Sequence, residues 1–367
     1  QVEREPGLEL VQGAEVTGLA REERDLEGRP RVAGVFARRK GAARELFPAE
    51  LVVDAAGRRS ALARWLDAIG AARPVEEAQP CGIFYVSRFY RLRPGRTPPQ
   101  QETALGADLG HLKYGIFHGD GGIFSVTFAA SPEDAPLRGL LRPGPFAAAA
   151  AAVPATAAWV DPSRAKAVTD VYGMANLRST RRCLVREGGP VASGVVAIGD
   201  AAVHTNPLYG RGCTFALLHA CLLADAVAAH PEALLAQALA LEEATRREIV
   251  PWYEMARRQE REAIRVARVR REGHPDPAPI DAQGRVDPRA YMRDLVRHGL
   301  VPAVRRDAQV LRAFLRSLNL LDAPQDLLKR PEILQRVLAC YQQRDEREQM
   351  ARGPDRSALV SILERAS

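Results

Sequence analysis

The residues with the clearest capacity for chemistry follow a short apolar run near the middle of the chain. After residues 194–198 come Gly199 and Asp200, and a short gap then leads to three further residues, Pro207, Gly210 and Gly212. An aspartate at the carboxyl end of a strand can accept hydrogen bonds from ligand hydroxyls, and glycines let the backbone approach a ligand closely. The first N–H groups of a helix can bind a group that carries negative charge. An ordinary turn capped by Asp200 would explain single residues of this set, but their occurrence together and in order favours a cofactor site.

A second pattern of the same kind lies near the start of the sequence. The apolar residues 51–53 end in Asp54-Ala55-Ala56-Gly57, and a helix-like segment follows over residues 60–69. This arrangement predicts another strand, tight turn and helix start.

The two patterns resemble the second and middle FAD motifs of flavin monooxygenases similar to para-hydroxybenzoate hydroxylase. That superfamily also contains styrene monooxygenases, flavin-dependent halogenases and geranylgeranyl reductases. The resemblance implies that Asp200 holds the ribityl chain of FAD. It further implies that the pyrimidine edge of the flavin lies against Pro207, Gly210 and Gly212. The backbone N–H groups near Cys213 and Thr214 would then face a flavin carbonyl oxygen.

The middle motif departs from the family pattern at one position. The resemblance places Ala56 and Gly57 against the cofactor, but Ala56 stands where the family has an aspartate. In single-component hydroxylases this motif is associated with pyridine-nucleotide binding as well as FAD, so the departure weakens the case for direct use of NAD(P)H. A separate flavin reductase is the other electron source. Asp54 could substitute for the missing carboxylate or could simply form the turn.

The resemblance implies an FAD-dependent oxidoreductase, in first place a monooxygenase of the hydroxylase or epoxidase type. Such an enzyme would oxidise an apolar or aromatic small organic molecule through a flavin C4a-(hydro)peroxide. The alternatives are a flavin-dependent reductase of the geranylgeranyl reductase type, a halogenase, and a non-catalytic relic or partner subunit without FAD. The sequence identifies no catalytic side chain: His204 and Tyr209 lie beside the expected flavin, but packing explains both.

The family opens with a strand, a Gly-x-Gly-x-x-Gly turn and a helix that bind the FAD pyrophosphate. No such motif occurs in the 367 residues, which begin with Gln1. We therefore expect a fragment of a longer gene, a reading frame assigned too late, or a second subunit that supplies the missing unit.

The predicted fold class is α/β (α+β), with a partial Rossmann-like FAD-binding domain, an inserted β-sheet substrate domain and a helical C-terminal region. The expected boundaries are 1–75 and 179–232 for the two FAD-binding segments, 76–178 for the sheet domain and 233–367 for the helical region. Period-2 alternation over residues 123–128 predicts a sheet with one covered face. It also places Tyr85 on the face opposite Arg88 and Tyr90. A long apolar helix is predicted over residues 212–229.

Composition supports a soluble enzyme of the cytoplasm. The five cysteines show no metal-ligand or disulfide spacing, so we expect reduced thiols and no metal site. The formal net charge is +7, but glutamates alternate with the arginines over residues 254–272, which favours a solvated helix face and no nucleic-acid partner. The most apolar stretch, residues 146–160, is broken by Pro154 and predicts no membrane span.

Overall fold

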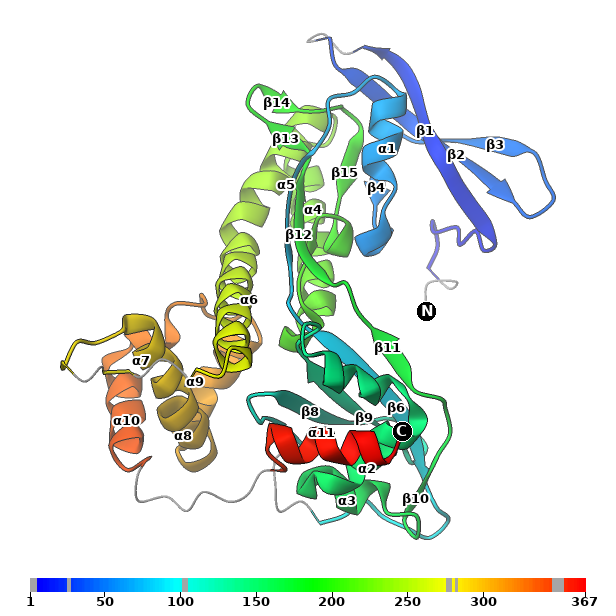
Figure 1. Cartoon of the computed structure of the whole chain (residues 1–367). Helices are drawn as coiled ribbons and strands as arrows, with labels where there is room; N and C mark the ends of the chain where they lie inside the picture. Colours follow the sequence, from blue (N-terminus) through cyan, green and yellow to red (C-terminus); the bar gives the residue numbers. More distant parts are fainter. Residues whose placement is uncertain (1–4, 25–27, 101–104, 275–278, 281–282, 345–352) are drawn as a thin grey trace. The chain divides into compact units, whose positions relative to one another are not determined.

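The computed structural model describes residues 5–24, 28–100, 105–274, 279–280, 283–344 and 353–367 (Figure 1). The chain divides into two compact units. The first contains Gln1–Gln79 and Arg178–Arg257, and the second contains Pro80–Leu177 and Arg258–Ser367. Each unit therefore combines two separate segments of the sequence.

The first unit contains the two strands that precede the predicted cofactor motifs. An antiparallel sheet is formed by β1 (Ala14–Arg24), β2 (Pro30–Arg39) and β3 (Arg44–Pro48). A separate parallel pair consists of β4 (Val52–Asp54) and β15 (Val195–Ala197). A third sheet has the order β16 (Val203–His204), β12 (Arg178–Cys183) and β5 (Val75–Pro80), and a small hairpin joins β13 (Val185–Arg186) to β14 (Gly189–Pro190).

The segment from Leu46 to Val53 does not form one continuous strand. The structure divides it into β3, which pairs with β2, and β4, which pairs with β15. Pro48 lies at the division, and a proline cannot donate a backbone hydrogen bond that would continue a ladder. The Ala49 N–H instead bonds to the carbonyl of Ala33 at 2.9 Å. This break turns the chain from one sheet into another.

The helices of the first unit are α1 (Leu62–Ala68), α4 (Gly212–Ala229), α5 (Leu234–Glu248) and the first part of α6 (Val250–Arg271). The predicted helix over residues 212–229 is confirmed by α4. Leu223 and Ala226 of α4 pack with Leu241 of α5 and with Val196 of β15 in one apolar cluster. Among the described helices, α4 is the one that is long and apolar enough to cross a membrane. This is only weak evidence for a membrane span, because core helices meet the same criteria.

A larger sheet organises the second unit. Its strand order is β10 (Ala165–Ala167), β6 (Phe84–Leu92), β9 (Ile123–Ala130), β8 (Leu112–His118) and β7 (Gly106–Asp108), and β11 (Tyr172–Met174) pairs with β6. Its covered face packs on α2 (Pro143–Ala152), α3 (Pro154–Val160) and α11 (Arg356–Arg365). Tyr90 is buried in that core and stacks on Phe124, whereas Tyr85 lies outside this cluster. The predicted separation of Tyr85 from Tyr90 is confirmed. The helices cover one face of the sheet as predicted, but Ser125 and Ala129 on the opposite face are buried as well, so that face is also partly covered.

The C-terminal helices of the second unit have a core of their own. They are α7 (Pro288–Leu295), a π-helical segment η6 (Val296–Leu300), α8 (Val301–Arg306), α9 (Ala308–Leu318) and α10 (Pro331–Gln342). Leu300, Val310 and Val337 lie in one buried cluster contributed by these helices. The helical character predicted for this region is confirmed.

Candidate functional site

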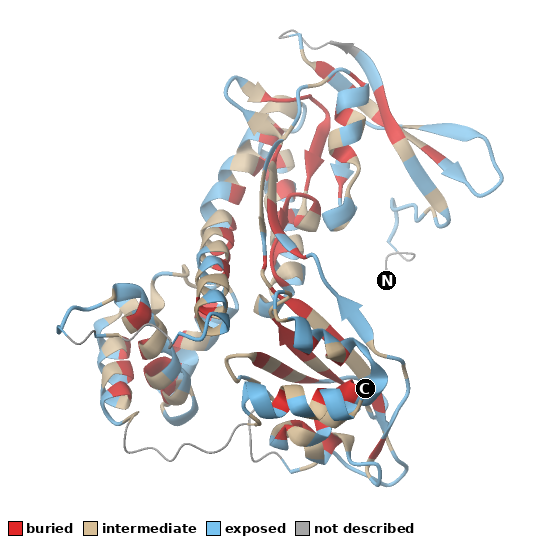
Figure 2. Cartoon of the chain, in the orientation of Figure 1, coloured by how far each residue is buried: buried red, intermediate tan, exposed pale blue. Residues whose placement is uncertain are grey.

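The structure brings the two predicted motifs together through the parallel pair β4 and β15. The register aligns Val52 with Val195 and Asp54 with Ala197, and the Ile198 N–H donates to the carbonyl of Asp54 at 3.0 Å. Both strands therefore end at the same edge. The turn that contains Ala56 and Gly57 lies beside the turn that contains Gly199 and Asp200. All three residues of β15 are buried (Figure 2).

The first turn is held by the carboxylate of Asp54. Its Oδ1 accepts the Ala56 N–H at 2.9 Å, and its Oδ2 accepts a short hydrogen bond from the Ser60 hydroxyl. Because Asp54 is buried and both of its oxygens are used, the carboxylate forms the turn and is not presented to a ligand. Ala56 is exposed, and Gly57 has a φ of +75°, which requires glycine.

Arg182 of β12 connects the two turns. Its guanidinium donates to the carbonyl of Ala201 at 3.3 Å and to that of Arg58 at 3.3 Å, and it pairs with Glu76 at 2.9 Å. These two carbonyls belong to the two motif turns, which lie far apart in the sequence. The arginine thus fixes their relative position within the first unit.

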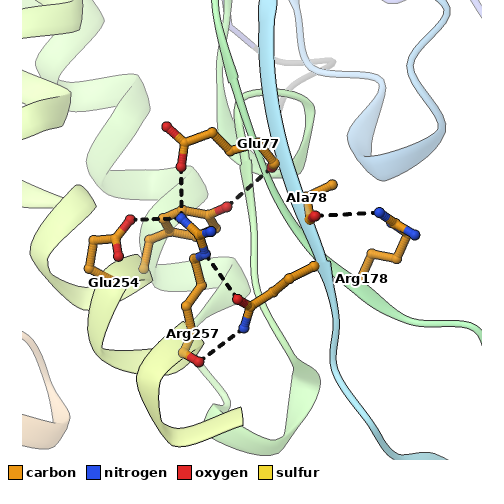
Figure 3. A network of polar contacts seen from close by, with 7 residues as sticks. Glu77, Ala78, Arg178, Glu254 and Arg257 are labelled. Carbon is orange, nitrogen blue, oxygen red and sulfur yellow. Dashed lines mark hydrogen bonds and ion pairs between the residues drawn. The ribbon is translucent and has the colours of Figure 1, made fainter. Parts of the chain in front are cut away.

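Replacing Arg182 by glutamine is expected to lower the free energy of unfolding by about 2 kcal/mol, since hydrogen bonds that involve a charged group contribute about 1.5–3 kcal/mol. Urea denaturation followed by tryptophan fluorescence measures the change. The matched control is Arg178→Gln on the same strand, because Arg178 makes a single contact of 3.4 Å with the carbonyl of Ala78 (Figure 3). Equal destabilisation by the two substitutions would contradict the bridging role of Arg182.

The turn after β15 is closely packed against α4. Gly199 has a φ of +56°, and a Cβ at this position would lie 3.2 Å from the Cβ of Ala216. The Gly199 N–H donates to Nδ1 of His219 at 3.1 Å, and the His219 Nε2 lies 3.2 Å from the hydroxyl of Thr245. Since Nδ1 accepts this hydrogen bond, the neutral ring carries its proton on Nε2, which donates to Thr245. Burial lowers the pKa of His219 to about 4, so this tautomer is neutral near pH 7.

Asp200 presents its carboxylate beside the N-terminus of α4. Its Oδ1 lies 3.7 Å from the position that a Cβ on Gly212 would occupy, and its side chain is 37% exposed. Oδ2 lies 3.0 Å from Nδ1 of His204, although neither ring nitrogen of this buried histidine makes an aligned hydrogen bond in the described part of the chain. We interpret this as a close electrostatic contact that leaves Asp200 accessible to a ligand.

The N-terminus of α4 has unpaired donors. Asn206 caps the short turn η5 (Pro207–Tyr209) by accepting the Leu208 N–H at 3.1 Å, and Gly210 then adopts a φ of +65° with open space around its Cα. Pro207 itself is exposed. No side chain caps α4. Among the described residues, no acceptor binds the backbone N–H groups of Gly212, Cys213 and Thr214, which are the first three residues of the helix. Cys213 and Thr214 are exposed, so their N–H groups lie where a ligand can approach them.

Tyr209 and its neighbours pack against the start of α6. The Tyr209 hydroxyl donates to the carbonyl of Ala256 at 3.4 Å, and the Arg211 guanidinium lies 4.4 Å above the centre of the Trp252 ring. These contacts give Tyr209 a packing role, and the structure assigns no catalytic function to it.

A polar network holds this part of α6 against the segment that contains residues 77–79 (Figure 3). Arg257 pairs with Glu77 at 2.7 Å and with Glu254 at 3.0 Å, and its carbonyl accepts from Gln79 at 3.0 Å. The hydroxyl of Tyr253 donates to the carbonyl of Glu77 at 3.2 Å, and burial raises the pKa of this tyrosine to about 12. The network therefore fixes the helix turn that supports Arg211.

Sequence reasoning did not identify Arg182 and His219 as parts of the site. Arg182 is one of two adjacent arginines in a strand, and nothing in its local pattern distinguishes it from Arg181. His219 is a polar residue within the apolar central part of α4, and that position could have indicated a buried hydrogen-bonding role.

The site residues are compatible with the flavin and ribityl portion of FAD. An accessible carboxylate at Asp200 can accept from hydroxyl groups, and unpaired N–H groups at α4 can donate to a carbonyl oxygen. The glycines at 57 and 210 have open space where a side chain would stand, so a planar group can approach the backbone there. The observed geometry therefore fits the predicted cofactor.

Part of the chain is similar in sequence to a known protein. No family model matches the sequence. The chain is 30% identical over 200 residues to Protein Rv3254 of Mycobacterium tuberculosis, which corresponds to 52% of this chain and 39% of that protein. The chain thus spans well under half the length of this relative.

Two solved structures match the chain to different degrees. The OxyS anhydrotetracycline hydroxylase from Streptomyces rimosus has a TM-score of 0.51 and 18% sequence identity, with 86% of this chain and 53% of that chain covered. The myxobacterial chondrochloren halogenase CndH, an FAD-dependent halogenase, has a TM-score of 0.47 and 18% identity, with 96% and 68% covered. The fold is therefore similar to that of the OxyS hydroxylase, which agrees with the predicted mixed α/β fold class.

Proposed function

We propose that this chain is part of an FAD-dependent oxidoreductase of the monooxygenase type that acts on an apolar or aromatic small molecule. One observation carries the proposal: an accessible carboxylate, Asp200, lies beside the uncapped N-terminus of α4 at the edge where two parallel strands end. This is the position at which open α/β sheets bind ligands.

Specific residues would bind the cofactor. FAD, when bound, supplies the redox chemistry. Asp200 would accept hydrogen bonds from the ribityl hydroxyls, and the N–H groups of Cys213 and Thr214 would donate to a flavin carbonyl oxygen. The positive end of the α4 dipole would stabilise negative charge at that oxygen. Ala56 and Gly57 would contact the cofactor through their backbone, because neither has a polar side chain.

The open face of the sheet in the second unit supports the proposed class of substrate. In the strand register Ser125 of β9 lies between Phe89 of β6 and Phe117 of β8. Phe89 is 40% exposed and Phe117 is 60% exposed. On the same face the hydroxyls of Ser87 and Thr127 lie 2.7 Å apart. Exposed aromatic rings beside a few hydroxyl groups form a surface suited to an apolar molecule with a limited number of polar atoms.

The electron source is proposed to be a separate flavin reductase. Ala56 provides no carboxylate at the position associated with pyridine-nucleotide binding, and the carboxylate of Asp54 is used within its own turn.

We place the protein in the cytoplasm because its cysteine spacing suggests reduced thiols.

The test of this function is a titration of the purified chain with FAD, followed by flavin fluorescence and the visible spectrum. Because the 367 residues contain no Gly-x-Gly-x-x-Gly turn for the FAD pyrophosphate, weak binding or none is expected for this chain alone. Saturable binding with a shifted flavin absorption band is expected for a longer chain that includes such a pyrophosphate-binding unit, and flavin that stays spectroscopically free with both chains would overturn the assignment. Where binding is found, oxygen consumption coupled to product formation distinguishes a monooxygenase from a reductase.

A further inference from the structure

Helix α9 has a row of exposed leucines on the side away from its core. Val310, Ala313 and Ser317 are buried. Three leucines at spacings of four and three residues are instead exposed: Leu311 by 39%, Leu315 by 44% and Leu318 by 42%. Residues at these spacings lie on one face of a helix. The helix is therefore apolar on a second face that no other part of the described chain covers.

The turn after α9 extends this row. Leu321 donates to the carbonyl of Arg316 at 2.9 Å and Leu320 donates to that of Ser317 at 3.2 Å, which is the Schellman pattern of helix termination. Leu320 has a φ of +60°, a conformation that normally belongs to glycine and costs a branched residue about 1 kcal/mol or more. The turn places Leu321, which is 64% exposed, directly after the helix. We call Leu311, Leu315, Leu318 and Leu321 the leucine face.

Positive charge surrounds the leucine face. Residues 288–344 contain eleven Lys and Arg against five Asp and Glu, a net charge of +6 out of +7 for the whole chain. Arg305 and Arg306 are exposed immediately before α9, and Arg312 is exposed on the helix itself. Arg316 and Arg330 are paired with Asp322, so they contribute less to the external field.

We propose that the leucine face docks on an anionic membrane surface. The leucines would enter the boundary between headgroups and acyl chains, and the arginines would contact anionic headgroups. At 1.5 Å per residue the row is about 15 Å long, so it can lie in the interface but cannot cross a bilayer. A second copy of the chain would bring the same positive charge to the contact, which favours an anionic partner. The proposal is independent of the function proposed for the first unit.

The test is co-sedimentation of the whole chain with vesicles of phosphatidylcholine alone or with about 30% phosphatidylglycerol, the probe being the vesicle itself. We expect binding to the anionic vesicles that weakens in high salt, because the charge attraction is screened. The triple substitution Leu311→Gln, Leu315→Gln and Leu318→Gln should lower the partition coefficient at least about tenfold. Arg305→Gln combined with Arg306→Gln should lower it several-fold for anionic vesicles only.

Leu239→Gln on α5 is the matched control, since Leu239 is 47% exposed on another helix and should leave binding unchanged. Circular dichroism confirms that each variant is folded. The proposal is overturned if the wild-type chain fails to bind anionic vesicles or if the triple variant binds equally well. It is also overturned if sedimentation velocity shows a dimer that the triple substitution dissociates, because the leucine face would then bind a second copy.

Discussion

The substitution Asp200→Asn is expected to weaken FAD binding by about tenfold or more. A hydrogen bond to a charged group contributes about 1.5–3 kcal/mol, and 1.4 kcal/mol corresponds to a factor of ten in affinity. Asparagine keeps the size of the side chain and one acceptor oxygen, so the change isolates the negative charge. The dissociation constant is measured by quenching of flavin fluorescence at fixed ionic strength.

Asp225→Asn provides the control for the Asp200 prediction. Asp225 is exposed on the same helix, α4, but far from its N-terminus, so its replacement should leave the affinity for FAD unchanged. Should both variants bind FAD as the wild-type chain does, Asp200 would have no role in holding the cofactor. A wild-type protein that includes a pyrophosphate-binding unit and still binds no FAD would instead refute the proposed function itself.

Acidification is expected to destabilise the first unit through His219. In the unfolded chain this histidine takes up a proton near pH 6.5, but in the folded chain burial lowers its pKa to about 4. Between these values the unfolded state binds more protons, so the free energy of unfolding falls as the pH falls. The 2.5-unit difference corresponds to about 3 kcal/mol, and this contribution becomes constant below about pH 4.

The His219 contribution is measured by urea denaturation at several pH values for the wild-type chain and for His219→Gln. Glutamine can accept from the Gly199 N–H and donate to Thr245, but it does not titrate. Burial also lowers the pKa of His111 in the second unit, so His111 contributes to the pH dependence of stability in both chains. Subtracting the free energy of unfolding of His219→Gln from that of the wild-type chain removes this shared contribution. Parallel stability curves for the two chains between pH 4 and pH 6.5 would show that His219 is not the group responsible.

The local elements around the site could be predicted because their signals are contained in short segments. An apolar run followed by Gly199 and Asp200 indicates a strand end, and α4 has the predicted bounds because residues from Gly212 to Ala229 are predominantly apolar and contain no proline. Period-2 alternation likewise identified the covered face of the sheet in the second unit. The sequence by itself therefore determined the elements, the candidate cofactor residues and the class of fold.

Only the tertiary structure decided how these elements meet. The pairing of β4 with β15 joins residues that are far apart in the chain, and local periodicity contains no information about which distant strand is the partner. The same is true of the bridge made by Arg182 and the contact of His219 with Gly199, since each depends on a backbone group supplied by another element. The division between β3 and β4 at Pro48 likewise depends on the two different sheets with which these strands pair, and those sheets are defined only by long-range pairing.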